Sequence, residues 1–274
     1  MPDWAAFVGL TGFLLTALLG LARLSQGAVR PDGVSATSDG VSPTNGHQDP
    51  TIPRFETQQA AAKRQQLSDT LAPDDLSTGA LLANVAFTQG LFGVLLVAGM
   101  FYFEIPPSAL GITRDALSTG LPAIAVGVGA GVVFWLGNEA AAALADGFGV
   151  AFDESLRELL APNSLTGWVV LLGGVLPVIA VVEELLFRAA AIGVPVAGLG
   201  APAWAMAIVA SVAFALGHGA QGRAGIVVTG ALGLALAALF VATDSLLVVV
   251  ITHYLVNTLE LVVHEGLGVG RLWA

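Results

Sequence analysis

The stretch Trp168-Val-Val-Leu-Leu-Gly-Gly-Val-Leu-Pro-Val-Ile-Ala-Val-Val-Glu183-Glu184-Leu-Leu-Phe-Arg188 decides the fold. No charged side chain occurs from Trp168 to Val182, and the apolar run continues on both sides of the charged residues to 167–195. A helix satisfies its own backbone hydrogen bonds, so an apolar run of this length is stable in lipid. The stretch therefore predicts a membrane-spanning helix with three charged side chains inside it.

The composition of the whole chain agrees with a membrane protein. Its 274 residues are 55% hydrophobic and 11% charged, and the mean hydropathy is +0.82. Soluble domains carry about a quarter of their residues as charged side chains. An outer-membrane barrel would show shorter segments that alternate between apolar and polar residues. The composition therefore predicts an all-α fold, a polytopic transmembrane helical bundle.

The apolar runs give the number of membrane segments. There are seven runs, at 4–22, 80–103, 121–145, 167–195, 203–218, 225–243 and 245–263. An eighth segment results if Gly193 and Pro195 end one helix before a re-entrant piece. Arg23 follows the first run, whereas a cleaved signal peptide has its basic residues before the run, so we expect this run to stay as a spanning helix.

Between the runs the composition changes, and this divides the chain into five parts. An N-terminal helix (1–23) precedes a polar, partly disordered linker (24–78), whose prolines prevent a long helix. Additional transmembrane helices and an amphipathic interfacial helix at 146–164 follow (79–163). The segment 164–265 carries the motifs described below, and 266–274 is a C-terminal tail.

The charges indicate the orientation of the chain and exclude one class of partner. Five of the ten basic residues lie in the first long connection, which the positive-inside rule places in the cytoplasm of a multi-pass protein of the cell membrane. The net charge of −10, without a basic stripe, argues against a nucleic-acid partner. The lipid bilayer is the expected surrounding.

Three polar positions within apolar runs indicate where chemistry takes place, because a charged group in a membrane helix needs a partner or a hydrated cavity. Glu184 and Arg188 are four residues apart, with the acid first, which favours an ion pair. Glu183 points about 100° away from Glu184 and remains free. The same spacing of four places Phe214 with His218, and His253 with Asn257, on one helix face each.

Two imidazoles, a carboxylate and a carboxamide are suited to two kinds of site. They can position and deprotonate a water molecule for attack on a peptide carbonyl. They can equally hold zinc, with an open position for an activated water. The residues alone leave both alternatives open.

The three motifs resemble those of the CAAX prenyl-protease and bacteriocin-processing (CPBP) family. They are Glu-Glu-x-x-x-Arg at 183–188, Phe-x-x-x-His at 214–218 and His-x-x-x-Asn at 253–257. The resemblance makes 164–265 a CPBP-like catalytic core and implies an intramembrane endopeptidase. It implies that Glu183 and His218 activate the water, and that His253 and Asn257 stabilise the oxyanion. Glu184, Arg188 and Phe214 would be supporting residues, and Glu183, His218 and His253 would be the ligands of any zinc ion.

The expected substrate is a membrane-associated protein or peptide. The alternative is a non-proteolytic membrane protein, either a bacteriocin-type self-immunity factor or an ion- or proton-coupled transporter that uses the same Glu and His groups. The sequence has no cysteine and no His-Glu-x-x-His motif, which excludes thiol proteases and zincin-type metalloproteases.

Three features outside the motifs also lead to predictions. Gly127, Gly129 and Gly131 predict a close helix contact in the membrane. Glu139 is interpreted as an interhelical hydrogen-bonding or snorkelling group, with a role as an extra acid in the catalytic cavity as the alternative. His264 and Glu265 are interpreted as a solvated helix end.

Overall fold

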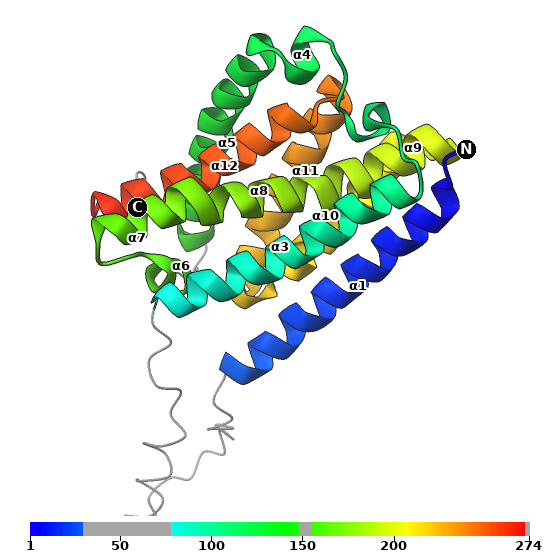
Figure 1. The fold of residues 1–274 in the computed structure, drawn as a ribbon. Coiled ribbons are helices and arrows are strands. Elements are labelled where there is room, and N and C mark those ends of the chain that lie inside the picture. Colours follow the sequence, from blue (N-terminus) through cyan, green and yellow to red (C-terminus); the bar gives the residue numbers. More distant parts are fainter. Residues whose placement is uncertain (30–77, 148–154, 272–274) are drawn as a thin grey trace, which may run out of the picture. The chain divides into compact units, whose positions relative to one another are not determined.

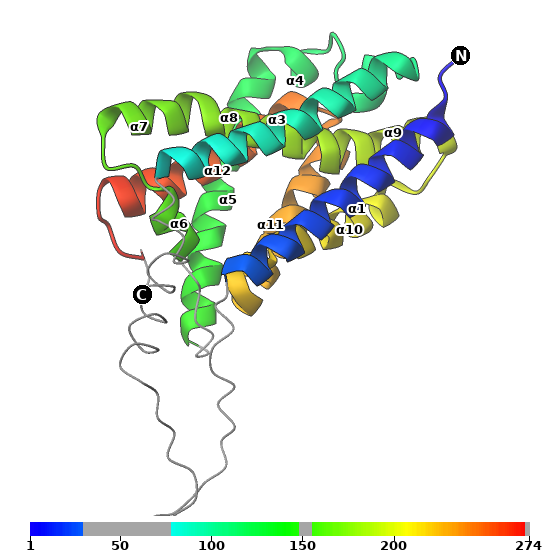
Figure 2. The same cartoon turned by 60° about the horizontal axis from the view of Figure 1, so that its bottom comes forward.

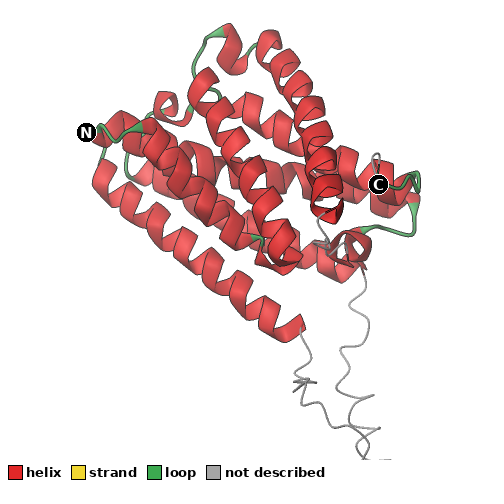
Figure 3. Cartoon of the chain, turned by 180° about the vertical axis from the view of Figure 1, so that it is seen from behind, coloured by secondary structure: helices red, strands yellow, loops and turns green. Residues whose placement is uncertain are grey.

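The computed structural model describes residues 1–29, 78–147 and 155–271, and these form helices joined by short connections (Figure 3). No strand occurs within these ranges, so the predicted all-α bundle is confirmed. Most of the predicted linker at 24–78 and the first part of the predicted interfacial helix lie outside the described residues. The described part of the predicted interfacial helix contains α6 (Ser155–Leu160).

Among the described residues, six helices are long and apolar enough to cross a membrane, which makes the chain a multi-pass membrane protein. They are α1 (Trp4–Val29), α3 (Thr78–Tyr102), α5 (Leu121–Gly147), the long helix Leu165–Leu199, α11 (Gly222–Thr243) and the span Leu246–Gly266. The remaining predicted segment is α10 (Ala203–Gly217), which is apolar but only 15 residues long. The predicted runs thus appear as six long helices and one short one.

The helix α1 ends later than predicted. The sequence suggested an end near Ala22 or Arg23, but the helix continues to Val29. The residues from Leu24 to Val29 include no proline, and the first helix-breaking residue is Pro31. The polar composition that suggested a linker here is therefore compatible with a further turn and a half of helix.

The long helix Leu165–Leu199 passes both of its prolines without a break. It consists of α7 (Leu165–Val170), the π-helical η2 (Leu171–Val175), α8 (Leu176–Glu184), the π-helical η3 (Leu185–Gly193) and α9 (Val194–Leu199). Pro177 and Pro195 are each the second residue after a π-helical segment, where wider turns relieve the clash of a proline ring with the preceding turn. The re-entrant break considered at Gly193 and Pro195 is absent.

The helix α8, which carries the two glutamates, packs between α3 and α12 (Leu246–Leu261) (Figure 1). The helix α12 packs in turn along α5. At Gly127 and Gly131, an added Cβ atom would lie 2.8 Å from Ile251 and 2.9 Å from Leu255 of α12. Nothing lies within 4 Å of such an atom at Gly129. The predicted close contact therefore involves the first and third glycines only.

Three further helices, α1, α10 and α11, pack around this central group of α3, α5, α8 and α12. The helix α10 packs against both α11 and η3, and α1 lies along α10 and α9 at the outer edge of the described bundle (Figures 1 and 2). The buried core includes Leu186, Phe187, Phe214, Leu236 and Phe240. The charged stretch of α8 and η3 is therefore enclosed by helices on several sides.

Candidate active site

The predicted ion pair between Glu184 and Arg188 is present and fully buried. Nη1 of Arg188 donates to Oε1 of Glu184 at 2.8 Å, and the two side chains are 1% and 0% exposed. Burial of two charges in an apolar medium is costly, so each needs several good partners. The structure supplies partners from three other helices, while Oε2 of Glu184 has no hydrogen-bond partner among the described residues.

Arg188 is held by α10 and α11 as well as by Glu184. Its Nη2 donates to the carbonyl oxygen of Gly233 at 3.0 Å, and its Cζ lies 4.6 Å from the centre of the Phe214 ring. An added Cβ atom at Gly233 would lie 2.9 Å from Phe214. Glycine at this position thus allows the aromatic ring to lie close to α11.

His253 of α12 contacts the same carboxylate. Its Nδ1 lies 2.6 Å from Oε1 of Glu184. A carboxylate accepts hydrogen bonds, so Nδ1 carries a proton, and in the neutral imidazole the opposite nitrogen, Nε2, then presents its lone pair. That Nε2 lies 3.8 Å from Oε2 of Glu183. His253 thus lies between the two glutamates and connects them.

Glu183 is buried, and one of its oxygens has no hydrogen-bond partner. The residue is 8% exposed, and its Oε1 accepts a hydrogen bond from Nε2 of Gln89 on α3 at 3.0 Å. Its Oε2 makes no hydrogen bond to any described residue. A buried carboxylate oxygen without a donor is costly and indicates a place for water or a substrate group. This oxygen faces Nε2 of His253.

The other two predicted residues lie beside this pair. His218 ends α10, its Nδ1 lies 2.9 Å from the carbonyl oxygen of Phe214, and its ring centre is 4.5 Å from that of Phe214. The Phe214 ring also contacts the His253 ring edge to face, at 6.0 Å. Asn257 is one helical turn after His253 and is partly exposed, without a hydrogen bond to any described residue. Phe214 therefore packs between the two imidazoles.

The imidazoles are in a form that suits both chemical alternatives. In His218, as in His253, Nδ1 faces an acceptor, so in the neutral imidazole Nε2 can accept a proton or bind a metal. Within the described ranges, however, Glu183, His218 and His253 do not bring three ligand atoms within 4.8 Å of one another. Zinc at these three residues stays a prediction.

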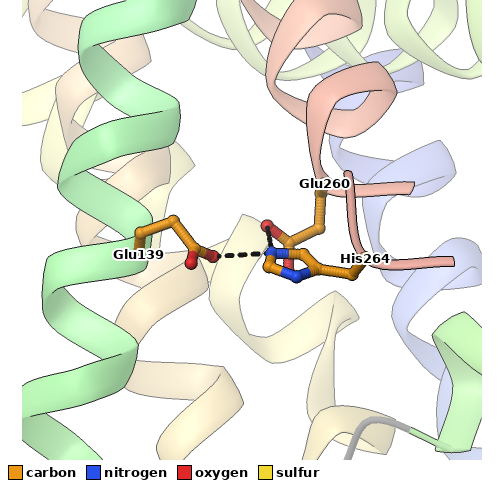
Figure 4. A group of neighbouring side chains, drawn as sticks. All are labelled: Glu139, Glu260 and His264. Carbon is orange, nitrogen blue, oxygen red and sulfur yellow. Dashed lines mark hydrogen bonds and ion pairs between the residues drawn. The ribbon is translucent and has the colours of Figure 1, made fainter. Parts of the chain in front are cut away.

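A second polar cluster does meet that spacing. Glu139 of α5, Glu260 of α12 and His264 of η5 (Val262–Gly266) form a group that could hold a metal ion (Figure 4). Nε2 of His264 lies 3.0 Å from Oε1 of Glu139. The carboxylates already receive guanidinium groups, because Arg271 contacts Glu139 and Glu260, and Arg157 of α6 contacts Glu260 at 2.9 Å. The cluster joins three helices and the C-terminal segment by ion pairs.

This cluster corrects one prediction and confirms another. The interpretation of His264 as part of a solvated helix end is wrong: His264 is buried, and its Nδ1 contacts the carbonyl oxygen of Val269 at 2.7 Å. The chain folds back after η5 and covers the imidazole, which sequence spacing does not reveal. The interhelical hydrogen bond expected of Glu139 is present.

Gln89 is the contact that sequence reasoning missed. It is a polar amide in the middle of the mainly apolar run 80–103, which also contains Asn84 and Thr88, and this was the available signal. An apolar groove of about 460 Å³ lies between α3 and α8 and is lined by residues such as Gly90, Val97, Val181 and Val182. Gln89 and Glu183 do not line it, but their sequence neighbours Gly90 and Val182 do.

Comparison with known proteins supports the predicted family. Residues 165–259 match the family described as type II CAAX prenyl endopeptidase Rce1-like. Neither a curated protein nor a solved structure matches the chain significantly. The matched segment contains the Glu183, His218 and His253 motifs and supports an endopeptidase that acts in the membrane. All three motifs lie in order inside this segment, so residues 165–259 are similar to the Rce1-like CAAX endopeptidases, the family that the motifs predict.

Proposed function

We propose that the protein is an intramembrane endopeptidase in which Glu183 acts as the general base. One observation carries the proposal: the buried Oε2 of Glu183, without a hydrogen-bond partner among the described residues, lies 3.8 Å from Nε2 of His253, which is an acceptor in the neutral imidazole with its proton on Nδ1. Two acceptors at this separation suit a water molecule that donates one hydrogen to each. Such a water is oriented with its own lone pairs directed away from both groups.

The reaction then needs two proton movements. Glu183 takes a proton from the water as the water oxygen forms a bond to the carbonyl carbon of the substrate. The tetrahedral intermediate collapses, the carbon–nitrogen bond breaks, and the proton passes from Glu183 to the leaving amine. The second hydrogen of the water stays on the new carboxyl group, so the products are a carboxylic acid and an amine, which ionise to a carboxylate and an ammonium group, and atoms and charge balance.

The remaining motif residues are assigned to the oxyanion and the proton path. Asn257 has an amide group that no described residue engages, and it lies one turn from His253, so its N–H can donate to the developing oxyanion. His218 presents an unprotonated Nε2 and assists Glu183 with the water proton. Glu184, Arg188 and Phe214 support these groups by fixing His253.

The surroundings of Glu183 favour a membrane-associated substrate. The groove between α3 and α8 is almost entirely apolar, and Val182, the residue before the proposed base, lines it. The family description names CAAX prenyl endopeptidases, so a peptide with a prenylated cysteine near its C-terminus is the first substrate to examine. An unprenylated apolar peptide is the second.

The test is cleavage of a farnesylated CAAX reporter peptide by the full chain in proteoliposomes, with the unprenylated peptide in parallel. We expect wild-type protein to cleave at least one of them, and Glu183→Gln, His218→Ala and His253→Ala to abolish cleavage. Glu139→Gln is the matched control, because it changes another buried glutamate that is not part of this site.

Two outcomes contradict the proposal. If Glu183→Gln and His218→Ala cleave as fast as wild type, the assignment is wrong. If wild-type protein cleaves neither peptide but moves protons or solute across the vesicle membrane, the transporter alternative replaces it. Metal analysis of the same preparations shows whether His218→Ala and His253→Ala also remove bound zinc, as the alternative metal mechanism requires.

A further inference from the structure

Gln89 reaches the active site from outside the segment that matches the family. The matched residues are 165–259, whereas Gln89 lies in the middle of α3 (Thr78–Tyr102). A carboxamide in a membrane helix is stable only with hydrogen-bond partners. Gln89 directs its Nε2 to Oε1 of Glu183 at 3.0 Å, which connects α3 with the proposed base.

The hydrogen bonding of Gln89 is incomplete. Its Oε1 is buried and has no donor among the described residues, so the side chain satisfies Glu183 and leaves its own carbonyl oxygen unpaired. An amide that only stabilised the packing of two helices would be expected to satisfy both of its ends. The arrangement is thus better suited to holding the Glu183 carboxylate than to stabilising the fold.

The contact has a geometric consequence for Glu183. A carboxylate can rotate about its last bond, and because its two oxygens are equivalent, the surroundings determine only the orientation of its plane. One oxygen, Oε1, is bound to Gln89, and the other, Oε2, lies 3.8 Å from Nε2 of His253. The hydrogen bond therefore restricts rotation of the carboxylate plane and keeps a lone pair directed at the proposed water position.

A glycine one turn further along α3 supports this contact. An added Cβ atom at Gly93 would lie 2.7 Å from Cγ2 of Val182, the residue before Glu183. The absence of a side chain at Gly93 allows α3 to lie close to α8 at this level. Gly90, in contrast, has nothing within 4 Å of such an atom. The close approach is thus local to the face of α3 that carries Gln89.

We propose that Gln89 is a positioning residue of the endopeptidase, which holds the Glu183 carboxylate so that Oε2 faces the attacking water. The proposal rests on the proposed function of Glu183. It also gives α3 a role in the reaction, although α3 carries none of the three motifs. The active site is then formed by the Rce1-like segment together with a helix that precedes it.

The test uses Gln89→Met, which keeps the length of the side chain and removes the donor, in the full chain in proteoliposomes. We expect kcat to fall by on the order of 10- to 100-fold with KM unchanged, as for a misplaced general base. Asn84→Met is the matched control, since it removes an amide from an exposed position of α3. In a Glu183→Ala background, Gln89→Met should lower the residual rate no further, because Gln89 acts through Glu183.

The outcomes separate this proposal from the proposed function. If Glu183→Gln abolishes cleavage while Gln89→Met cleaves like wild type, the role of Gln89 is disproved and the endopeptidase stands. A rise in KM alone, or an additive loss in the Glu183→Ala background, also overturns it. If Gln89→Met lowers the thermal unfolding temperature, the same measurements are made on Gln89→Asn. The Asn side chain is still a polar amide, but it is too short to bring its N–H donor to Glu183. Failure of wild-type protein to cleave removes both proposals.

Discussion

Nδ1 of His253 lies 2.6 Å from Oε1 of Glu184, the same oxygen that receives Nη1 of Arg188 at 2.8 Å. One carboxylate oxygen therefore serves two donors from different helical segments, and it fixes both the orientation and the tautomer of the imidazole. Glu183 and Glu184 are neighbours in sequence, but only Glu184 is neutralised by the arginine. The consecutive glutamates thus have separate tasks, support of the histidine and contact with the proposed water.

Replacement of Glu184 by Gln tests this division. A Gln amide can present its N–H to Nδ1 and thereby favour the tautomer with the proton on Nε2, which removes the lone pair that faces Glu183. We expect kcat for the reporter peptide to fall at least about 100-fold, as for other histidines held in the wrong tautomer. Glu104→Gln, at an exposed glutamate, is the control. Cleavage at the wild-type rate by Glu184→Gln would show that the tautomer is irrelevant.

The Arg188 side chain should contribute mainly to stability. Arg188→Met leaves Glu184 buried and without its cation, which typically costs about 3–5 kcal/mol. We expect a large fall in the thermal unfolding temperature in detergent, and a partial recovery in the double variant Glu184→Gln/Arg188→Met, which has no buried charge at this pair. If the double variant is less stable than Arg188→Met, the stability lost in Arg188→Met is not caused by the missing charge partner of Glu184.

Much of the fold follows from the sequence, because lipid imposes a simple rule. Apolar runs near the length of a bilayer must form helices, and the run 121–145 corresponds to α5 (Leu121–Gly147). The rule says less about the residues at which each helix begins and ends. The polar residues after Arg23 continue α1 to Val29, and the π-helical turns before Pro177 and Pro195 keep one helix intact. Such adjustments depend on local backbone geometry rather than on composition.

For the site, the spacing of residues along one helix predicted contacts within that helix. Contacts between different helices could not be predicted from the sequence. The pair of Glu184 and Arg188 follows from their separation by four residues. The approach of His253 to both glutamates depends on how α12 packs on α8, and Gln89 has no motif around it. His264 was misinterpreted for the same reason, since Glu139 and the returning C-terminal segment bury it.

The second cluster should stabilise the fold without taking part in cleavage. Glu139→Gln removes a buried negative charge that pairs with His264 and Arg271, so we expect a lower thermal unfolding temperature. The value of kcat/KM, measured per folded molecule at a temperature where both proteins are intact, should stay at that of wild type. A metal analysis of Glu139→Gln and wild type shows whether an ion binds at this cluster. Loss of cleavage together with loss of an ion would connect the cluster to the reaction.

The glycines of α5 allow a matched test of helix packing. Alanine favours the helix by about 1 kcal/mol over glycine, so a substitution without steric conflict should stabilise it. At Gly127 the new methyl group would lie 2.8 Å from Ile251 and 3.0 Å from the carbonyl oxygen of Val248, whereas at Gly129 it would have open space. We expect Gly127→Ala to lower the free energy of unfolding by about 1–3 kcal/mol, as overpacking does. Gly129→Ala should leave stability unchanged or raise it. Since α12 carries His253, Gly127→Ala should also reduce kcat, and equal behaviour of the two variants would contradict the observed packing of α5 on α12.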